Sequence, residues 1–135
     1  MREPASGWRD HASEFWSGDA DAVLDRDQYG HPAPELRTHV RLRWTPADLY
    51  FLFQCDYQEL YLNPSPRLDR ETNELWNWDV AEVFIGAGGP GLRRYREFEV
   101  SPLGEWVDLD IDLDSPHHED GWIWTSGMEA AARID

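Results

Sequence analysis

The stretch that decides the fold is residues 38–56, which reads THVRLRWTPADLYFLFQCD. Apolar Val40, Leu42 and Trp44 alternate with polar residues, and this period of two is typical of a half-buried strand. Pro46 lies in the link where a type I turn favours proline, and a second apolar run follows directly. The stretch therefore predicts an antiparallel β-hairpin.

A second region with a period of two covers residues 95–112. A two-residue turn at Pro102 and Leu103 sets the register of its two strands, because each face must keep one character. This register places Glu99 opposite Trp106. The predicted apolar face consists of Phe98, Val100, Val107, Leu109 and Ile111. The predicted opposite face consists of Tyr95, Glu97, Glu99, Trp106, Asp108, Asp110 and Asp112.

The rest of the chain supports the same fold class. Residues 57–78 contain two prolines and mixed charge without a sustained period, which predicts a long loop. No segment shows a convincing helical period. We therefore expect an all-β protein, an antiparallel β-sandwich of immunoglobulin-like or jelly-roll type, with residues 1–135 as one domain.

Composition excludes several classes of partner. The chain has 27 acidic and 12 basic residues, a formal net charge of −15, which opposes binding to nucleic acid or to an anionic membrane. No apolar run approaches the roughly 18 residues of a transmembrane helix. Residues 1–4 lack the apolar stretch of a signal peptide, so either the chain is cytoplasmic or its leader is missing. The single cysteine, Cys55, excludes an internal disulfide and is expected to be a small buried residue.

Two tryptophans precede an acidic strand in residues 75–85, which read LWNWDVAEVFI. A flat indole ring can stack on the apolar face of a sugar, and an ionised carboxylate accepts strong hydrogen bonds from hydroxyls. Trp76 and Glu82 have these properties. The alternative interpretation is that Trp76 and Trp78 belong to the core, since tryptophan is highly buried on average.

Four segments in this order resemble the family 9 carbohydrate-binding modules, which are related to the DOMON β-sandwiches. They are GWRDHA at residues 7–12, the hairpin at 38–56, the acidic strand at 75–85, and YREFEVSPLG at 95–104. The resemblance covers nearly the whole chain. It implies a non-catalytic domain that binds ends of oligo- or polysaccharides such as cellulose or xylan. It also implies an extracellular or periplasmic location, structural calcium, and a link to a catalytic domain.

The resemblance also implies a binding site. Family members place ligand contacts at the positions of Glu82 and Glu99 and an aromatic wall at the position of Trp76. Together with the predicted register, this gives a carbohydrate-binding set of Trp76, Glu82, Tyr95, Glu99 and Trp106. The chain departs from the family at Glu99 and Ser101, where sugar-binding members carry arginine and asparagine.

The C-terminal end also differs from the family pattern. The family's second stacking tryptophan lies in a C-terminal segment, which this chain ends before reaching, so we expect an incomplete copy. Alternation in residues 128–134 predicts one more strand, which would leave an open sheet edge.

Two clusters are candidate metal ligands. Asp108, Asp110, Asp112 and Asp114 alternate along one strand, with neighbours about 7 Å apart, too far for all four to bind one Ca²⁺. Asp108 and Asp110 with a loop residue are the calcium candidates. Residues 117–120, HHED, are expected to be a polar loop rather than a zinc site, because no further ligand lies at a suitable spacing.

Glycoside hydrolysis, haem binding and protein docking are the alternatives to sugar binding. Glycoside hydrolysis by Glu82 and Glu99 requires carboxyl groups about 5–9.5 Å apart, and no further catalytic motif supports an enzyme. Related sandwich domains bind haem through histidine and methionine, for which His39, His117 and Met128 are the candidates. Met128 fits better as a core residue of the last strand. A third alternative is an acidic surface that docks another protein.

Overall fold

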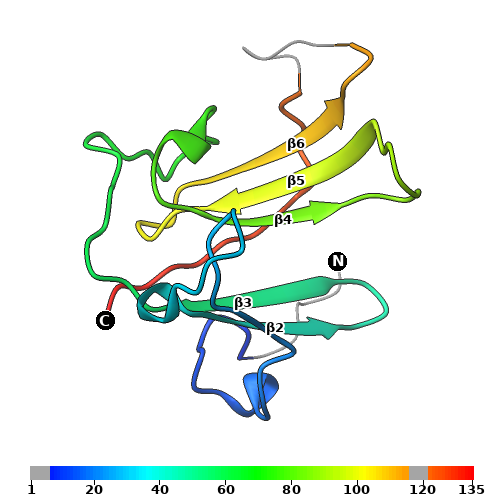
Figure 1. The fold of residues 1–135 in the computed structure, drawn as a ribbon. Helices are drawn as coiled ribbons and strands as arrows, with labels where there is room; N and C mark the ends of the chain where they lie inside the picture. The colour runs from blue at the N-terminus through cyan, green and yellow to red at the C-terminus, as the bar shows by residue number, and fades with distance from the viewer. Residues whose placement is uncertain (1–6, 116–121) are drawn as a thin grey trace. The chain divides into compact units, whose positions relative to one another are not determined.

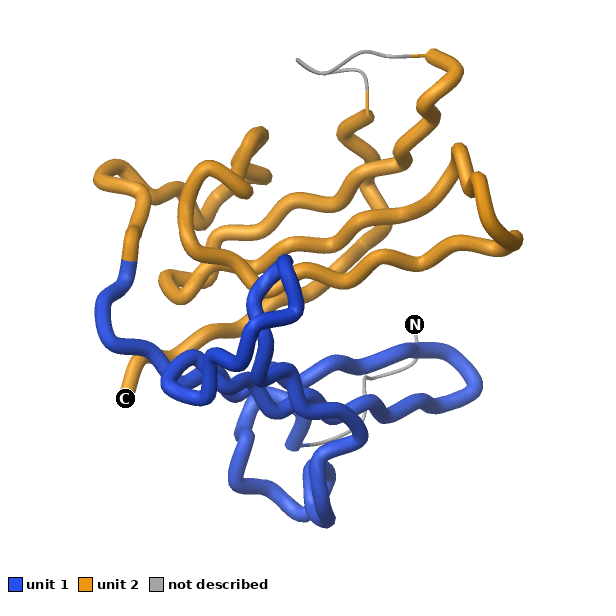
Figure 2. The backbone as a smooth tube through the Cα atoms, in the orientation of Figure 1, with its two compact units in different colours: residues 1–60 blue, residues 61–135 orange. Residues whose placement is uncertain are grey.

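The computed structural model describes residues 7–115 and 122–135. Its strands form two three-stranded antiparallel sheets, and its helices in these residues are three short 3₁₀ turns (Figure 1). The predicted all-β class is confirmed. The chain divides into two compact units, Met1–Leu60 and Tyr61–Asp135 (Figure 2). The sandwich arrangement and the single domain stay predictions.

Unit 1 contains the predicted hairpin. Its sheet has the order β1-β2-β3, and β2 pairs with β3 from Thr38 opposite Cys55 to Trp44 opposite Leu49. The turn is closed by the Thr45 hydroxyl oxygen, which accepts hydrogen bonds from the backbone N–H groups of Ala47 and Asp48. The elements of this unit are η1 (Glu14–Trp16), β1 (Ala22–Leu24), η2 (Pro34–Leu36), β2 (Thr38–Trp44) and β3 (Leu49–Cys55).

Two burial predictions for this hairpin are wrong. Cys55 is exposed, and the side chain of Trp44 is 74% exposed. The N-terminal segment covers the other face of β3, where the Phe15 ring lies 5.0 Å from the ring of Tyr50. Tyr50 is buried, and because side chains alternate along a strand, Leu49 and Cys55 point to the face opposite Tyr50.

Unit 2 carries the acidic strand and its neighbours. The sheet order is β4-β5-β6, and Ile123 forms one further bridge to Leu109 on β6. The predicted loop at 57–78 is confirmed apart from one 3₁₀ turn near its end. The elements of this unit are η3 (Leu75–Asn77), β4 (Ala81–Ile85), β5 (Arg94–Val100) and β6 (Trp106–Asp112).

The predicted last strand is wrong, because residues 128–134 are irregular. After Trp124, whose N–H donates to the Asp108 carbonyl, the chain leaves β6. The Ser126 N–H donates to the Asp108 side chain at 2.8 Å, and Gly127 has φ +82°. These contacts turn the chain away from β6 after Trp124, so the ladder of backbone hydrogen bonds ends there.

The predicted register of the β5–β6 hairpin is wrong by one residue. Val100 faces Trp106, so the turn has three residues rather than two. The Ser101 N–H donates to the Glu105 carbonyl at 2.9 Å, and the Gly104 N–H donates to the Ser101 carbonyl at 2.9 Å. Gly104 has φ +88°, the left-handed conformation that follows a type I turn in a bulged hairpin.

The observed register also satisfies the charges on this sheet. Arg96 forms an ion pair with Asp110 at 2.8 Å, and Arg94 forms one with Asp112 at 2.8 Å. The predicted register would have set acidic residues against acidic or aromatic ones, and like charges facing each other destabilise a sheet. Asp110 and Asp112 therefore each face an arginine across the strands.

The one-residue shift also changes which residues share a face. Val107, Leu109 and Ile111 are buried together with Leu75 and form the core of unit 2, against which Val80, Tyr95 and Trp122 pack. The three core residues of β6 lie on the same face of the sheet as Glu97 and Glu99, whereas the predicted register placed them on the opposite face. The core of this unit therefore surrounds acidic side chains.

A buried carboxylate fixes the long loop of unit 2. Glu105 is fully buried, and its Oε1 accepts hydrogen bonds from Asn63 Nδ2 at 2.7 Å and Thr72 Oγ1 at 3.3 Å. Its Oε2 accepts from the Ser101 hydroxyl at 3.3 Å. This residue joins two parts of the loop to the turn before β6.

Candidate functional site

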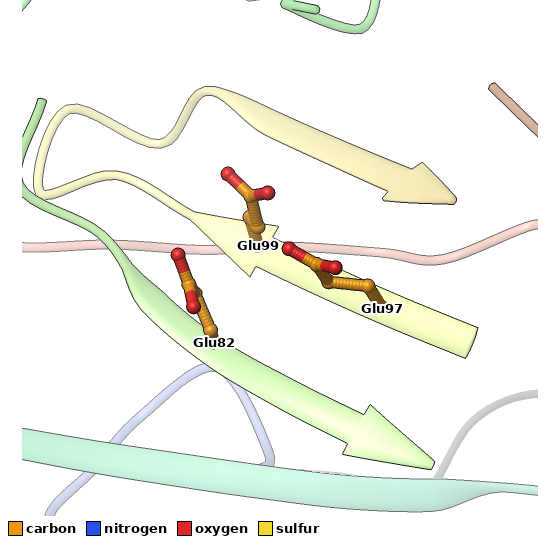
Figure 3. A group of neighbouring side chains, drawn as sticks. All are labelled: Glu82, Glu97 and Glu99. Carbon is orange, nitrogen blue, oxygen red and sulfur yellow. The ribbon is translucent and has the colours of Figure 1, made fainter. Parts of the chain in front are cut away.

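Three glutamates converge on one side of β4 and β5 (Figure 3). Glu82 on β4 faces Glu99 on β5, and Glu97 lies two residues before Glu99 on the same strand. Each contributes one carboxylate oxygen to a group in which all oxygens lie within 4.8 Å of one another. We call these three residues the glutamate triad.

Glu99 is the most unusual member of the triad. Its side chain is fully buried, it faces Val107 of the core, and neither carboxylate oxygen accepts a hydrogen bond in the described structure. Burial first, and then the neighbouring Glu97 and the charge of Glu82, raise the pKa of Glu99 to about 9. Burial and then Glu97 also raise the pKa of Glu82.

The triad has no cationic partner in the described part of the chain. None of its carboxylates takes part in an ion pair, although the neighbouring Arg94 and Arg96 both pair with β6 aspartates. A buried carboxylate without a hydrogen bond or a counter-charge is costly. The sheet thus pairs Asp110 and Asp112 with arginines on one face and leaves the three glutamates together on the other.

Trp76 lies beside this triad on a fixed turn. Its neighbour Leu75 is fully buried in the core, whereas Trp76 is 41% exposed. The turn η3 packs against β5. It begins after Glu74, which has φ +58°, an uncommon conformation for a residue other than glycine. Core packing on one side therefore holds an indole ring at the surface on the other.

A second exposed aromatic is tied to the same segment. The Asp79 N–H donates to the Tyr61 carbonyl at 2.9 Å, and the Tyr61 N–H donates to Asp79 Oδ2 at 2.8 Å. Tyr61 is 68% exposed. Sequence reasoning missed Tyr61 because its loop has no readable period. It also left Glu97 out of the site, although alternation with Glu99 would have identified it.

The structure brings together part of the predicted sugar site. Glu82 and Glu99 are adjacent, and Tyr95 is on their face of the sheet, where burial and then Glu97 raise its pKa. Trp106 is on the opposite face because of the register. It lines a shallow groove of about 410 Å³ with Leu68, Leu103, Gly104 and residues 128–132.

The predicted calcium candidates are engaged elsewhere. Asp110 pairs with Arg96, and buried Asp108 accepts a hydrogen bond from the Ser126 N–H. Burial and the neighbouring Asp108 raise the pKa of Glu71 to about 7. Asp108 and Asp110 both lie on the face of the sheet opposite the glutamate triad. The triad is therefore a separate acidic cluster that the sequence did not indicate as a metal site.

The structure gives little support to the haem candidates. Met128 is half-buried at the groove beside Trp106 rather than in a strand. His39 lies on β2 of unit 1, and His117 lies outside the described residues, as does the rest of the predicted polar loop. Haem binding stays a prediction from the sequence.

Comparison with known proteins identifies one distant relative. The chain is 29% identical over 89 residues to a protein of the fungus Arthroderma benhamiae named "Extracellular protein". The match covers 65% of the chain but 39% of that protein, so the chain corresponds to well under half of the relative. No family model and no solved structure matches the chain. No helix in residues 7–115 or 122–135 has the length and apolar character of a membrane span.

Proposed function

We propose that this chain is a non-catalytic carbohydrate-binding module that acts outside the cell. The observation that carries the proposal is the position of Trp76, which is 41% exposed although Leu75 beside it is fully buried. An isolated exposed tryptophan is ordinary, but one fixed by the core next to carboxylates is suited to a sugar. Ring stacking is favourable there because the core already fixes the turn that carries the indole.

The proposed ligand contacts differ from the predicted set. A sugar ring stacks on Trp76, and half-buried Glu82 accepts hydrogen bonds from its hydroxyls. Tyr61 offers a second exposed ring on the segment that is tied to Asp79. Glu99 is too buried to contact a sugar directly. Trp106 is excluded from this site by its place on the opposite face.

Two further observations support the proposal. The partner that Glu82 would need for glycoside hydrolysis is Glu99, and a fully buried side chain cannot reach a glycosidic bond. This favours binding over catalysis. The name of the fungal relative supports an extracellular location. The resemblance to family 9 modules supports xylan or cellulose ends as ligands.

The test is titration calorimetry of the chain against xylo- and cello-oligosaccharides. Trp76→Ala should weaken binding roughly ten- to a hundredfold, since stacking and charge-assisted hydrogen bonds contribute about 1–3 kcal/mol each. Trp44→Ala is the matched control, because Trp44 is 74% exposed and lies in unit 1, on a different sheet from Trp76. Thermal melts establish that both variants are folded.

Two results would overturn the proposal. If Trp76→Ala binds the sugar as tightly as the unaltered chain, the ring does not contact the ligand. If the unaltered chain binds no member of a broad glycan panel, the module has another function, and the docking of a protein partner by its acidic surface becomes the better interpretation.

A further inference from the structure

The glutamate triad combines two independent features. The first is the convergence of three carboxylates from two strands, with their oxygens within 4.8 Å of one another. The second is that Glu99, whose side chain lies on the same side of the strands as Glu82 and Glu97 (Figure 3), is fully buried and neither of its oxygens has a hydrogen-bond partner. Buried polar groups in proteins nearly always have a partner. The missing partner is therefore a ligand, and three carboxylates select a cation.

The coordination habits of the two ions distinguish between them. The three oxygens lie within 4.8 Å of one another, a limit that is compatible with either Ca²⁺ or Mg²⁺. Mg²⁺ demands near-ideal octahedral geometry and keeps several waters, whereas Ca²⁺ takes six to eight oxygens in flexible arrangements that include bidentate carboxylates. A cluster of carboxylates with one fully buried member therefore suits Ca²⁺ better.

We propose that Glu82, Glu97 and Glu99 form a calcium-binding site. Three carboxylates supply up to six oxygens, within the six to eight that Ca²⁺ takes. The half-buried Glu82 and Glu97 leave a side from which an ion and its remaining waters can enter. The ion joins β4 to β5 and replaces the repulsion between Glu82 and Glu99, which face each other across the strands.

The site does not depend on the proposed sugar binding, because its test contains no sugar. Chelator-treated chain is titrated calorimetrically with CaCl₂ and, separately, with MgCl₂. We expect one Ca²⁺ per chain, at least tenfold weaker binding of Mg²⁺, and a melting temperature that rises with added Ca²⁺.

Three variants locate the ion. Glu99→Gln and Glu82→Gln should each weaken Ca²⁺ binding at least tenfold, because each removes a charged ligand. Glutamine has nearly the same size and shape as glutamate, so Glu99→Gln should retain a folded protein in which the loss of binding can be measured, and thermal melts check this. Asp110→Asn is the matched control: it removes one charge from the same sheet, on the opposite face. It should change Ca²⁺ affinity less than twofold.

Either of two outcomes overturns the proposal. One is that the unaltered chain does not bind Ca²⁺ at millimolar concentration. The other is that Asp110→Asn abolishes binding while Glu99→Gln does not, which would place the ion at the β6 aspartates. Loss of Ca²⁺ binding without any change in sugar affinity would leave the proposed function intact.

Discussion

The buried pair Glu71 and Asp108 makes the stability of unit 2 depend on pH. Glu71 Oε2 is buried without a hydrogen-bond partner, and Asp108 is 1% exposed. Burial and then Asp108 raise the pKa of Glu71 from 4.5 to about 7. The folded chain thus retains a proton that the unfolded chain releases. This contribution to stability is complete below about pH 4.5 and is lost as the pH rises through about 7.

The substitution Glu71→Gln should remove this loss of stability at higher pH. One pKa unit corresponds to about 1.36 kcal/mol, so the full shift sets an upper limit of about 3.4 kcal/mol. Glu71 is half-buried, and screening by solvent reduces the expected effect to about 1–2 kcal/mol. The variant should therefore be more stable than the unaltered chain by this amount at pH 8. At pH 5 the two should be nearly equal, because an amide and a protonated carboxyl can both donate to Asp108.

Urea unfolding at pH 5 and pH 8 measures this difference. All other carboxyl groups are the same in both proteins, so the comparison isolates Glu71. Glu59→Gln removes one charge from an exposed position and should behave like the unaltered chain. The reasoning is refuted if Glu71→Gln loses as much stability between pH 5 and pH 8 as the unaltered chain does.

Two further predictions concern the turn before β6. Gly104→Ala should cost about 1 kcal/mol through the φ +88° conformation alone, since the nearest atom to an added Cβ is a Leu68 side-chain atom at 3.9 Å. Chemical denaturation should show a smaller loss for Gly104→Asn, and equal stability of Gly104→Ala would contradict the assigned turn. Glu105→Ala should cost about 3–5 kcal/mol, because it leaves Asn63 and other donors without an acceptor in a buried site. Proteolysis within residues 61–74 should accelerate in this variant, and an unchanged rate would show that the loop is held by other contacts.

The strands of this protein could be predicted from the sequence, but one register could not. The period of two in residues 38–56 specified the hairpin of unit 1, since alternation and a proline turn agreed there. In the second hairpin, Pro102 and Leu103 suggested a two-residue turn, whereas Gly104 extends it to three. Matching Arg94 and Arg96 to the aspartates of β6 would have favoured the observed register over the predicted one, because the predicted register sets no arginine opposite an aspartate.

The candidate site was predicted only in part, and the register error in the second hairpin explains much of the difference. Glu82 and Glu99 were expected to be close, and they face each other directly. Their burial could not be foreseen, because the register error placed the core on the wrong side of β5. The error also moved Trp106 into the site. Glu97 was left out of the site although alternation along the strand places it on the face of Glu99. Tyr61 depends on a hydrogen-bonded pair with Asp79, and no local pattern in the sequence encodes such a pair.

Glu82 also matters for how copies of this chain behave toward one another. Strand β4 forms one border of its sheet and reads AEVFI, with Phe84 56% and Ile85 39% exposed. A short apolar border strand is a template for pairing with a second copy. A carboxylate within such a strand opposes this pairing, as gatekeeper residues do in aggregation-prone segments. Glu82, the second residue of β4, is therefore expected to reduce edge-to-edge pairing between copies of this chain.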